Sequence, residues 1–192
     1  MGFAHETVSR QERYHGAIFS VFTDRVTMSG GGTAARDVVE NRGAVVVVAV
    51  DDQDRVVLIR QYRHPIKRHL WELPAGLRDV VGEDEALTAG RELAEEADLV
   101  AGRMEPLIDL HTSPGFADEF VRVFLARDLA PVPEADRYTR TDEEADIEVR
   151  RVDLDEAVAM VFRGEITNAA TVGGVLAAAR ARDSGWTLLR SA

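Results

Sequence analysis

The sequence contains no cysteine. Disulfide bonds, thiol catalysis and zinc–thiolate sites are therefore excluded, and the composition fits a reducing compartment. Long apolar stretches are also absent, because the longest run, residues 44–50, is far shorter than the roughly 20 apolar residues of a membrane-spanning helix. The N-terminus has no basic start followed by an apolar run, as a secretory signal would have. We therefore expect a cytoplasmic protein without a membrane partner.

Positive charge is scarce as well. The chain has 23 Lys and Arg residues against 34 Asp and Glu residues, for a net charge of -11 over 192 residues. Such a chain has no overall basic field to attract phosphates, so nucleic acid is not an expected partner. A phosphate-bearing substrate would need local help from a metal ion and arginine. The length is sufficient for a sizeable core in one compact domain.

Residues 83–97 are predicted to form a helix. The segment has no proline, consists mostly of good helix formers, and carries acidic residues in its first turn, where the helix dipole favours negative charge. Ala86, Gly90, Leu93 and Ala97 recur at three- and four-residue spacing. They predict a narrow stripe of small apolar residues that lies close against a sheet.

Glu92, Glu95 and Glu96 occupy the same helix at spacings that bring their carboxylates together. Such like-charged pairs repel by a few tenths of a kcal/mol in an isolated helix. A divalent cation would compensate, and carboxylates without histidine or cysteine suit a hard ion such as Mg²⁺ or Mn²⁺. By spacing alone, a solvated acidic face with Arg91 nearby is the more common explanation.

The apolar runs of the chain predict its strands. Residues 43–50 are continuously apolar and β-branched, as in a strand buried on both faces, and residues 55–63 return as a second strand. Three short strands, at 17–22, 24–28 and 36–40, predict an N-terminal antiparallel piece after a polar and partly mobile start. Further strands are predicted at 107–110, 120–126 and 147–152, with a turn-rich loop at 112–119.

Two more helices are predicted near the C-terminus. Asp153 opens a segment that resembles a capping box for a helix to about Phe162, and Asn168 is an expected N-cap for a last helix to about Arg182. Helices interspersed with mixed strands indicate an α/β sandwich, with the acidic helix packed against a central mixed sheet.

The stretch from Gly76 to Leu99 spells G-x6-E-x7-R-E-L-A-E-E-A-D-L. It resembles the Nudix box, G-x5-E-x7-R-E-U-x-E-E-x-G-U with U aliphatic. One extra residue lies before Glu83, in a loop where insertions are tolerated. Asp98 stands where the family has glycine, a position that often needs a left-handed backbone, and Asp is among the few other residues that adopt it. We therefore expect a working box.

Further segments resemble those of bacterial ADP-ribose pyrophosphatases within the Nudix hydrolase superfamily. They include a proline, Pro114, fifteen positions beyond Leu99, where that subfamily has its marker proline. The segments read Arg-Gln-Tyr-Arg at 60–63, Glu-Leu-Pro-Ala-Gly at 72–76, Ser-Pro-Gly-Phe at 113–116 and Glu-Glu-Ala-Asp at 143–146. The resemblance implies a Nudix-type α/β/α sandwich over residues 43–192, an antiparallel extension over residues 1–42 that serves dimerisation, and a homodimer.

The resemblance also implies roles for individual residues. The Ala75 carbonyl, Glu92 and Glu96 would hold Mg²⁺ or Mn²⁺, with Glu95 a further ligand and Arg91 orienting the box. Glu144 would activate the attacking water, with Glu143 and Asp146 of the same loop as the alternatives. The residues along the substrate would be Arg63, Asp79, Ser113, Gly115 and Glu119. Trp71 is expected to be a core anchor, with a contact near adenine as the alternative.

The implied reaction is metal-dependent hydrolysis of ADP-ribose to AMP and ribose 5-phosphate. A diphosphate resists attack by water because it is strongly anionic, so metal ions and a general base are the expected requirements. Two alternatives stay open at this point. One is hydrolysis of another nucleoside diphosphate derivative, such as a nucleotide sugar, NADH or FAD. The other is a nucleotide-sensing module without catalysis, because a fold does not fix a function.

Overall fold

The structure is a computed structural model that describes residues 5–78, 82–141 and 145–189. It divides into two compact units. The first contains residues 1–43 and 111–120, and the second contains residues 44–110 and 121–192. Among the residues described, no helix is both long enough and apolar enough to cross a membrane.

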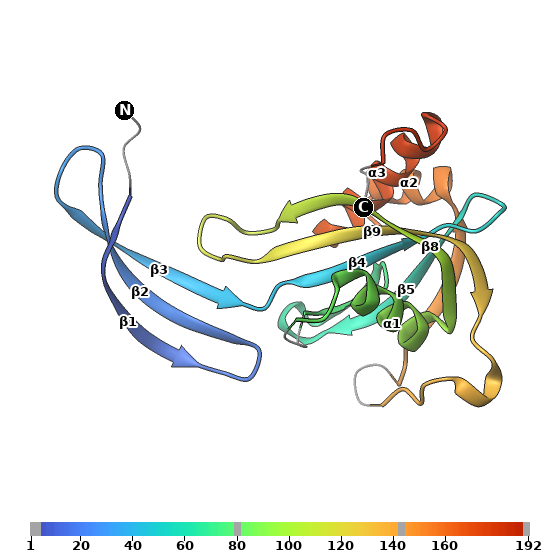
Figure 1. The fold of residues 1–192 in the computed structure, drawn as a ribbon, viewed down its shortest axis with the longest axis horizontal. Coiled ribbons are helices and arrows are strands. Elements are labelled where there is room, and N and C mark those ends of the chain that lie inside the picture. Colours follow the sequence, from blue (N-terminus) through green and yellow to red (C-terminus); the bar gives the residue numbers. More distant parts are fainter. Residues whose placement is uncertain (1–4, 79–81, 142–144, 190–192) are drawn as a thin grey trace. The chain divides into compact units, whose positions relative to one another are not determined.

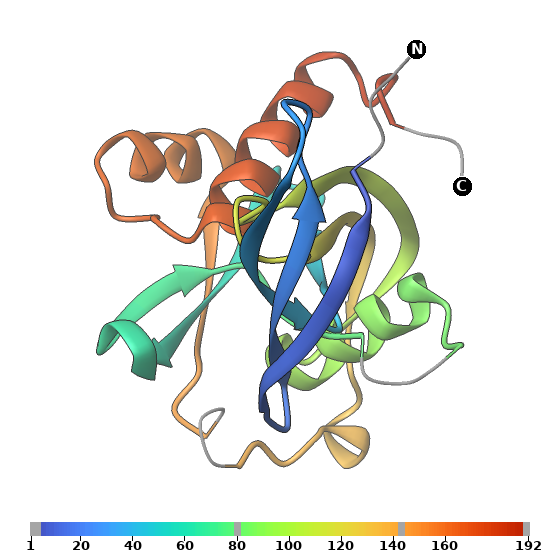
Figure 2. The same cartoon turned by 90° about the vertical axis from the view of Figure 1, so that its left-hand side faces the viewer.

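The first unit contains an antiparallel sheet of β1 (Thr7–His15), β2 (Phe19–Thr27) and β3 (Thr33–Asn41), in that order (Figure 2). The predicted N-terminal antiparallel piece is therefore confirmed. Its boundaries differ, because β1 lies in the segment predicted to be a polar, partly mobile start, and β2 joins two predicted strands into one.

Pairing rather than burial holds β1 in place, which is why its sequence gave no strand signal. Every residue of β1 is exposed. Its Arg10 donates two hydrogen bonds of 2.7 Å to Asp24 on β2, whose side chain is buried. The Arg10 guanidinium also lies 4.6 Å from the centre of the Phe22 ring. The hydrogen bond from Arg10 lowers the pKa of Asp24, so this carboxylate stays charged.

The second unit contains two sheets. A four-stranded sheet has the order β7 (Ala75–Leu77), β4 (Ala44–Ala49), β9 (Phe120–Pro131) and β8 (Leu99–His111). It is mixed, because β4 runs parallel to β9 and antiparallel to β7. The other sheet is antiparallel, with the order β10 (Glu148–Asp153), β5 (Arg55–Arg63) and β6 (Arg68–Glu72). The expected mixed sheet is thus present, with a second sheet beside it in the same unit.

Three helices cover the sheets of this unit. Residues of α1 (Glu85–Ala97) pack against Val45 and Val47 of β4, whereas α2 (Leu154–Phe162) and α3 (Ala169–Asp183) belong to the cluster of Val46 and Val48. Successive residues of a strand point to opposite faces, so β4 is buried on both, as predicted. Figure 1 shows α1 on one side of β4 and the other two helices on the opposite side, giving the expected α/β/α layers.

Side chains cap the starts of α1, α2 and α3, and those at α2 and α3 are the predicted ones. Asp84 caps α1 by accepting a 2.8 Å hydrogen bond from the Ala86 amide. The Asp153 carboxylate accepts from the amides at the start of α2, and the Asn168 side chain accepts from the Thr171 amide of α3. These side chains satisfy amides that have no partner within the helix.

The packed stripe of α1 differs from the predicted one at one position. Ala89, Leu93 and Ala97 are buried against the sheet, and Ala86 packs at their edge. Gly90 is not part of this contact, because a Cβ added to it would meet no atom within 4 Å. Leu93 therefore lies at the middle of the buried face, and the face runs through Ala89 one turn before it rather than through Gly90.

Candidate active site

Two glutamates of α1 pack against the backbone of β7. Glu96 is 3% exposed, and its Oε2 accepts a 2.8 Å hydrogen bond from the Ala75 amide. Glu92 is 8% exposed and lies so close to Gly76 that a Cβ there would come within 2.0 Å of its Cδ. Residues four apart lie on one face of a helix, so both carboxylates meet the same strand. A side chain at position 76 would therefore displace the Glu92 carboxylate from its place against β7.

Arg91 balances the carboxylates of this helix. Its guanidinium lies 2.7 Å from Glu92, 3.3 Å from Glu95 and 3.8 Å from Glu83. Burial by itself would lower the pKa of Arg91, but the negative charges of these glutamates outweigh it and raise the pKa. Arg91 therefore stays protonated and draws Glu92 and Glu95 toward one cation.

Arg63 at the end of β5 meets a buried carboxylate. Its Nε and Nη2 donate to the two oxygens of Glu72 at 3.0 and 2.7 Å, and Glu72 is only 2% exposed. The Arg63 side chain is 40% exposed, so the pair joins a partly exposed arginine to a buried carboxylate. The sequence interpretation missed the role of Glu72. The signal for it was a charged residue directly before the buried Leu73.

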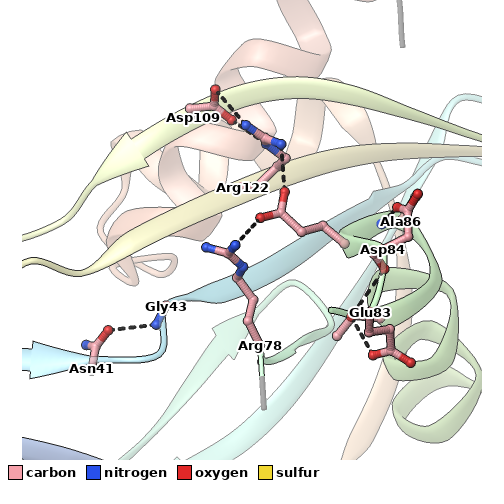
Figure 3. Close-up of polar contacts among 10 residues, drawn as sticks. Asn41, Gly43, Arg78, Glu83, Asp84, Ala86, Asp109 and Arg122 are labelled. Carbon is pink, nitrogen blue, oxygen red and sulfur yellow. Dashed lines mark hydrogen bonds and ion pairs between the residues drawn. The ribbon is translucent and has the colours of Figure 1, made fainter. Parts of the chain in front are cut away.

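A chain of ion pairs holds the start of α1 (Figure 3). Glu85 lies 2.6 Å from Arg78, which follows β7, and 2.6 Å from Arg122 on β9. Arg122 continues the chain with a 2.9 Å bond to Asp109 on β8, and this hydrogen bond is the main reason that the pKa of Arg122 is raised. The sequence did not reveal this chain, because its members are far apart along the polypeptide. Beside it lies a cavity of about 390 Å³ that Glu85, Met104 and Phe124 help to line.

The remaining described candidates lie in the first unit. The Ser113 carbonyl accepts hydrogen bonds from the two amides at 116 and 117, at 3.1 and 2.9 Å, so the loop after β8 turns tightly around Gly115. Glu119 accepts from the Thr112 hydroxyl and, at 3.3 Å, from the Asn41 amide group. The loop is therefore turn-rich, as predicted, and Glu119 is tied to both the loop and β3.

The other residues to which the sequence analysis assigned a role are Asp79, Glu144 and Trp71. Asp79 and Glu144 lie outside the described residues. Trp71 is partly buried and packs against the core of the second unit, as expected. The guanidinium groups of Arg60 and Arg150 lie 6.0 and 5.9 Å from its ring centre.

The donor set at β7 suits a hard cation. Glu92 and Glu96 on α1 offer only carboxylate oxygens, and the Ala75 carbonyl on β7 is a further oxygen donor. Within residues 5–78, 82–141 and 145–189, no three Asp, Glu, His or Cys side chains form a complete metal site. Two buried carboxylates on one helix, with Arg91 beside them, can hold a cation together with ligands from a substrate or water. This combination is suited to a polyphosphate.

Comparisons with known proteins agree with this chemistry. The NUDIX domain family matches residues 40–172. The ADP-ribose pyrophosphatase of Mycobacterium tuberculosis is 49% identical over 174 residues, which cover 90% of this chain and 82% of that protein. The ADP-ribose pyrophosphatase of Bacillus subtilis is 34% identical over 166 residues, covering 86% and 88%.

Two further similarities are informative. The methanol dehydrogenase activator of Bacillus methanolicus is 34% identical over 170 residues, covering 88% of this chain and 90% of that protein. A solved structure described as an ADP compounds hydrolase superposes with a TM-score of 0.81 at 22% identity, covering 95% of this chain and 97% of that chain. At this identity the structural match shows a shared fold.

Proposed function

Because the chain belongs to the NUDIX family, we propose that it hydrolyses the diphosphate of ADP-ribose to AMP and ribose 5-phosphate, with Mg²⁺ or Mn²⁺ as cofactor. The observation that carries the proposal is the packing of the buried Glu92 and Glu96 against the Ala75–Gly76 backbone. The names of the relatives from M. tuberculosis and B. subtilis support the choice of substrate.

In this proposal the Ala75 carbonyl, Glu92 and Glu96 hold the cation, and Glu95 is an additional ligand. When bound, a divalent cation neutralises the phosphate oxygens and lowers the pKa of a water molecule. Arg91 keeps Glu92 and Glu95 oriented through the ion pairs described above. Because its charge is fixed, it limits the repulsion among the glutamates before a cation arrives.

Further residues would bind the substrate in this proposal. Arg63 would donate to a phosphate while Glu72 keeps the guanidinium in place. Ser113, Gly115 and Glu119 would contact the remaining phosphate and ribose oxygens, together with Asp79. Glu144 would take a proton from the attacking water, a role typically worth about 10²–10⁴-fold in rate.

Metal-dependent release of AMP tests the proposal directly. The purified protein is expected to form AMP and ribose 5-phosphate from ADP-ribose in the presence of Mg²⁺ or Mn²⁺, and none in EDTA. The measurement is product formation by chromatography, with the metal restored after chelation as a control. Turnover that persists in EDTA would contradict the role assigned to Glu92 and Glu96.

Another nucleoside diphosphate derivative is the second candidate substrate. A relative at 34% identity is named methanol dehydrogenase activator, so similarity at that level does not settle the substrate. Values of kcat/KM for ADP-ribose, nucleotide sugars, NADH and FAD decide between the candidates, because specificity is the ratio of these values. Tight nucleotide binding by calorimetry without any turnover would instead support the sensing module.

We also propose that the protein is a cytoplasmic homodimer that associates through residues 1–42. In the first unit, large apolar side chains on the β1–β2 hairpin are exposed, such as Val8 at 60% and Tyr14 at 53%. Exposed apolar side chains gathered on one element suit an interface. Sedimentation equilibrium is expected to give twice the 21.1 kDa chain mass. A single-chain mass at micromolar concentration would refute the dimer.

A further inference from the structure

The end of α1 is held by one arginine from a distant part of the chain. Asp98 follows the helix in the left-handed conformation, with φ 54° and ψ 37°. Its carboxylate accepts a 2.7 Å hydrogen bond from Nη2 of Arg140, and Nε of the same arginine donates to the Glu95 carbonyl at 2.8 Å. The Arg140 and Asp98 side chains are 20% and 26% exposed, so the contact is largely shielded from water.

This contact uses two properties of a helix C-terminus. The last carbonyls of a helix have no partner within it, and they carry partial negative charge that attracts cations. Arg140 satisfies the Glu95 carbonyl and places its charge at this end of the helix. No Lys, Arg or His of α1 itself lies in the last turn. The stabilising cation is therefore supplied from outside the helix.

Asp98 is the residue that departs from the glycine of the family motif. The left-handed conformation is unfavourable for an L-residue because Cβ approaches the following carbonyl oxygen, and glycine avoids this contact. The aspartate, however, provides the carboxylate that accepts a hydrogen bond from Arg140. A glycine would keep the backbone conformation and lose this ion pair. Compared with glycine, aspartate at position 98 has a less favourable backbone conformation but gains a specific ion pair.

The same helix end also holds the start of the segment that contains Arg140. The Asp98 carbonyl accepts a 2.9 Å hydrogen bond from the Val132 amide, just after β9. Residues 132–140, which include a short 3-10 helix at Glu134–Asp136, are therefore fastened to Asp98 at both ends. Figure 1 shows this gold segment leaving β9 within the second unit. Residue 140 is thereby fixed relative to the helix that carries Glu92, Glu95 and Glu96.

We propose that Asp98 and Arg140 form a positioning pair, which sets where the chain enters the segment 141–146 relative to the glutamates of α1. This inference rests on the proposed function, in which that segment supplies the general base. Arg140 and Asp98 do not touch the substrate in this proposal. They act by holding one part of the catalytic machinery in position relative to the other. Small errors in such positioning lower the rate of reaction.

The test compares Asp98→Gly with Asp128→Gly. Asp128 is a matched control, because it also has a positive φ, of 56°, and pairs with an arginine, Arg103, at 2.6 Å. Its pair lies at the surface, with both side chains more than half exposed. Hydrogen exchange of peptides covering residues 133–148 is measured in wild type and both variants, alongside kcat and KM for ADP-ribose with saturating Mg²⁺.

Asp98→Gly is expected to speed exchange in these peptides and to lower kcat by roughly ten- to a hundredfold with KM little changed. Asp128→Gly should alter neither. Arg140→Gln should reproduce the loss, and the double variant Asp98→Gly/Arg140→Gln should be no worse than the more affected single variant, because the two residues act as one unit.

Unchanged exchange in Asp98→Gly, an unchanged kcat despite faster exchange, or losses that multiply in the double variant would each overturn the inference. Exchange requires no substrate. If wild type did not turn over ADP-ribose, the proposed function would fail, and the proposed positioning role would fail with it. The exchange data would still show whether the pair fastens the segment.

Discussion

Glu96→Gln is expected to lower kcat for ADP-ribose by on the order of 10²–10³-fold. A metal ion contributes several kcal/mol of charge stabilisation in the transition state, and each 1.4 kcal/mol corresponds to about tenfold in rate. Glutamine has nearly the same shape, and its carbonyl oxygen can still accept the hydrogen bond from the Ala75 amide. The change therefore removes the negative charge while leaving the packing of α1 on β7 in place.

Steady-state kinetics across a Mg²⁺ titration checks this expectation, together with thermal unfolding to show that the variant is folded. Glu156→Gln on α2 is the matched control, because Glu156 is also a helix glutamate but is exposed and belongs to a different helix. It should retain wild-type kcat. Full Mg²⁺-dependent turnover by Glu96→Gln would remove Glu96 from the metal site.

Gly76→Ala is expected to abolish most of the activity and to destabilise the fold. The added methyl would lie 2.0 Å from Cδ of Glu92, and this carboxylate has little room to move because it is 8% exposed and paired with Arg91. Overpacking of this kind costs about 1–3 kcal/mol of stability. Displacing a metal ligand by even 1 Å can cost about 100-fold in rate.

Gly90→Ala on α1 provides the contrast. A Cβ at position 90 meets no atom within 4 Å, and alanine is favoured over glycine in a helix by about 1 kcal/mol. This variant should therefore gain stability and keep its kcat, whereas Gly76→Ala loses both. Unfolding in urea and kcat measured on the same preparations compare the two. An active, stable Gly76→Ala enzyme would show that Glu92 does not need its position against β7.

The predictions that rest on local chemistry were confirmed. The β-branched run of β4, the Asp153 and Asn168 caps and the proline-free α1 each carry their structural signal within a few residues. The Nudix motif likewise identified the family, because its residues are contiguous and their order is specific. Asp98 adopts the left-handed backbone that the family glycine suggested.

The failures occurred where structure depends on partners remote in the sequence. The strand β1 has no buried face, so its sequence contains no apolar pattern that predicts a strand. Pairing with β2 holds it in place. Gly90 has a spacing that suits the buried stripe, but the packing of α1 on the sheet buries Ala89 instead.

The sequence by itself determined the family, the helix with its clustered carboxylates and the oxygen-donor chemistry of the candidate site. Only the tertiary structure decided which partner each charged residue has. The Arg63–Glu72 pair and the ion pair between Arg140 and Asp98 join residues that different elements bring together. A local pattern specifies the conformation of its own segment. An ion pair between segments depends on how their backbones pack, and that packing is a property of the whole fold.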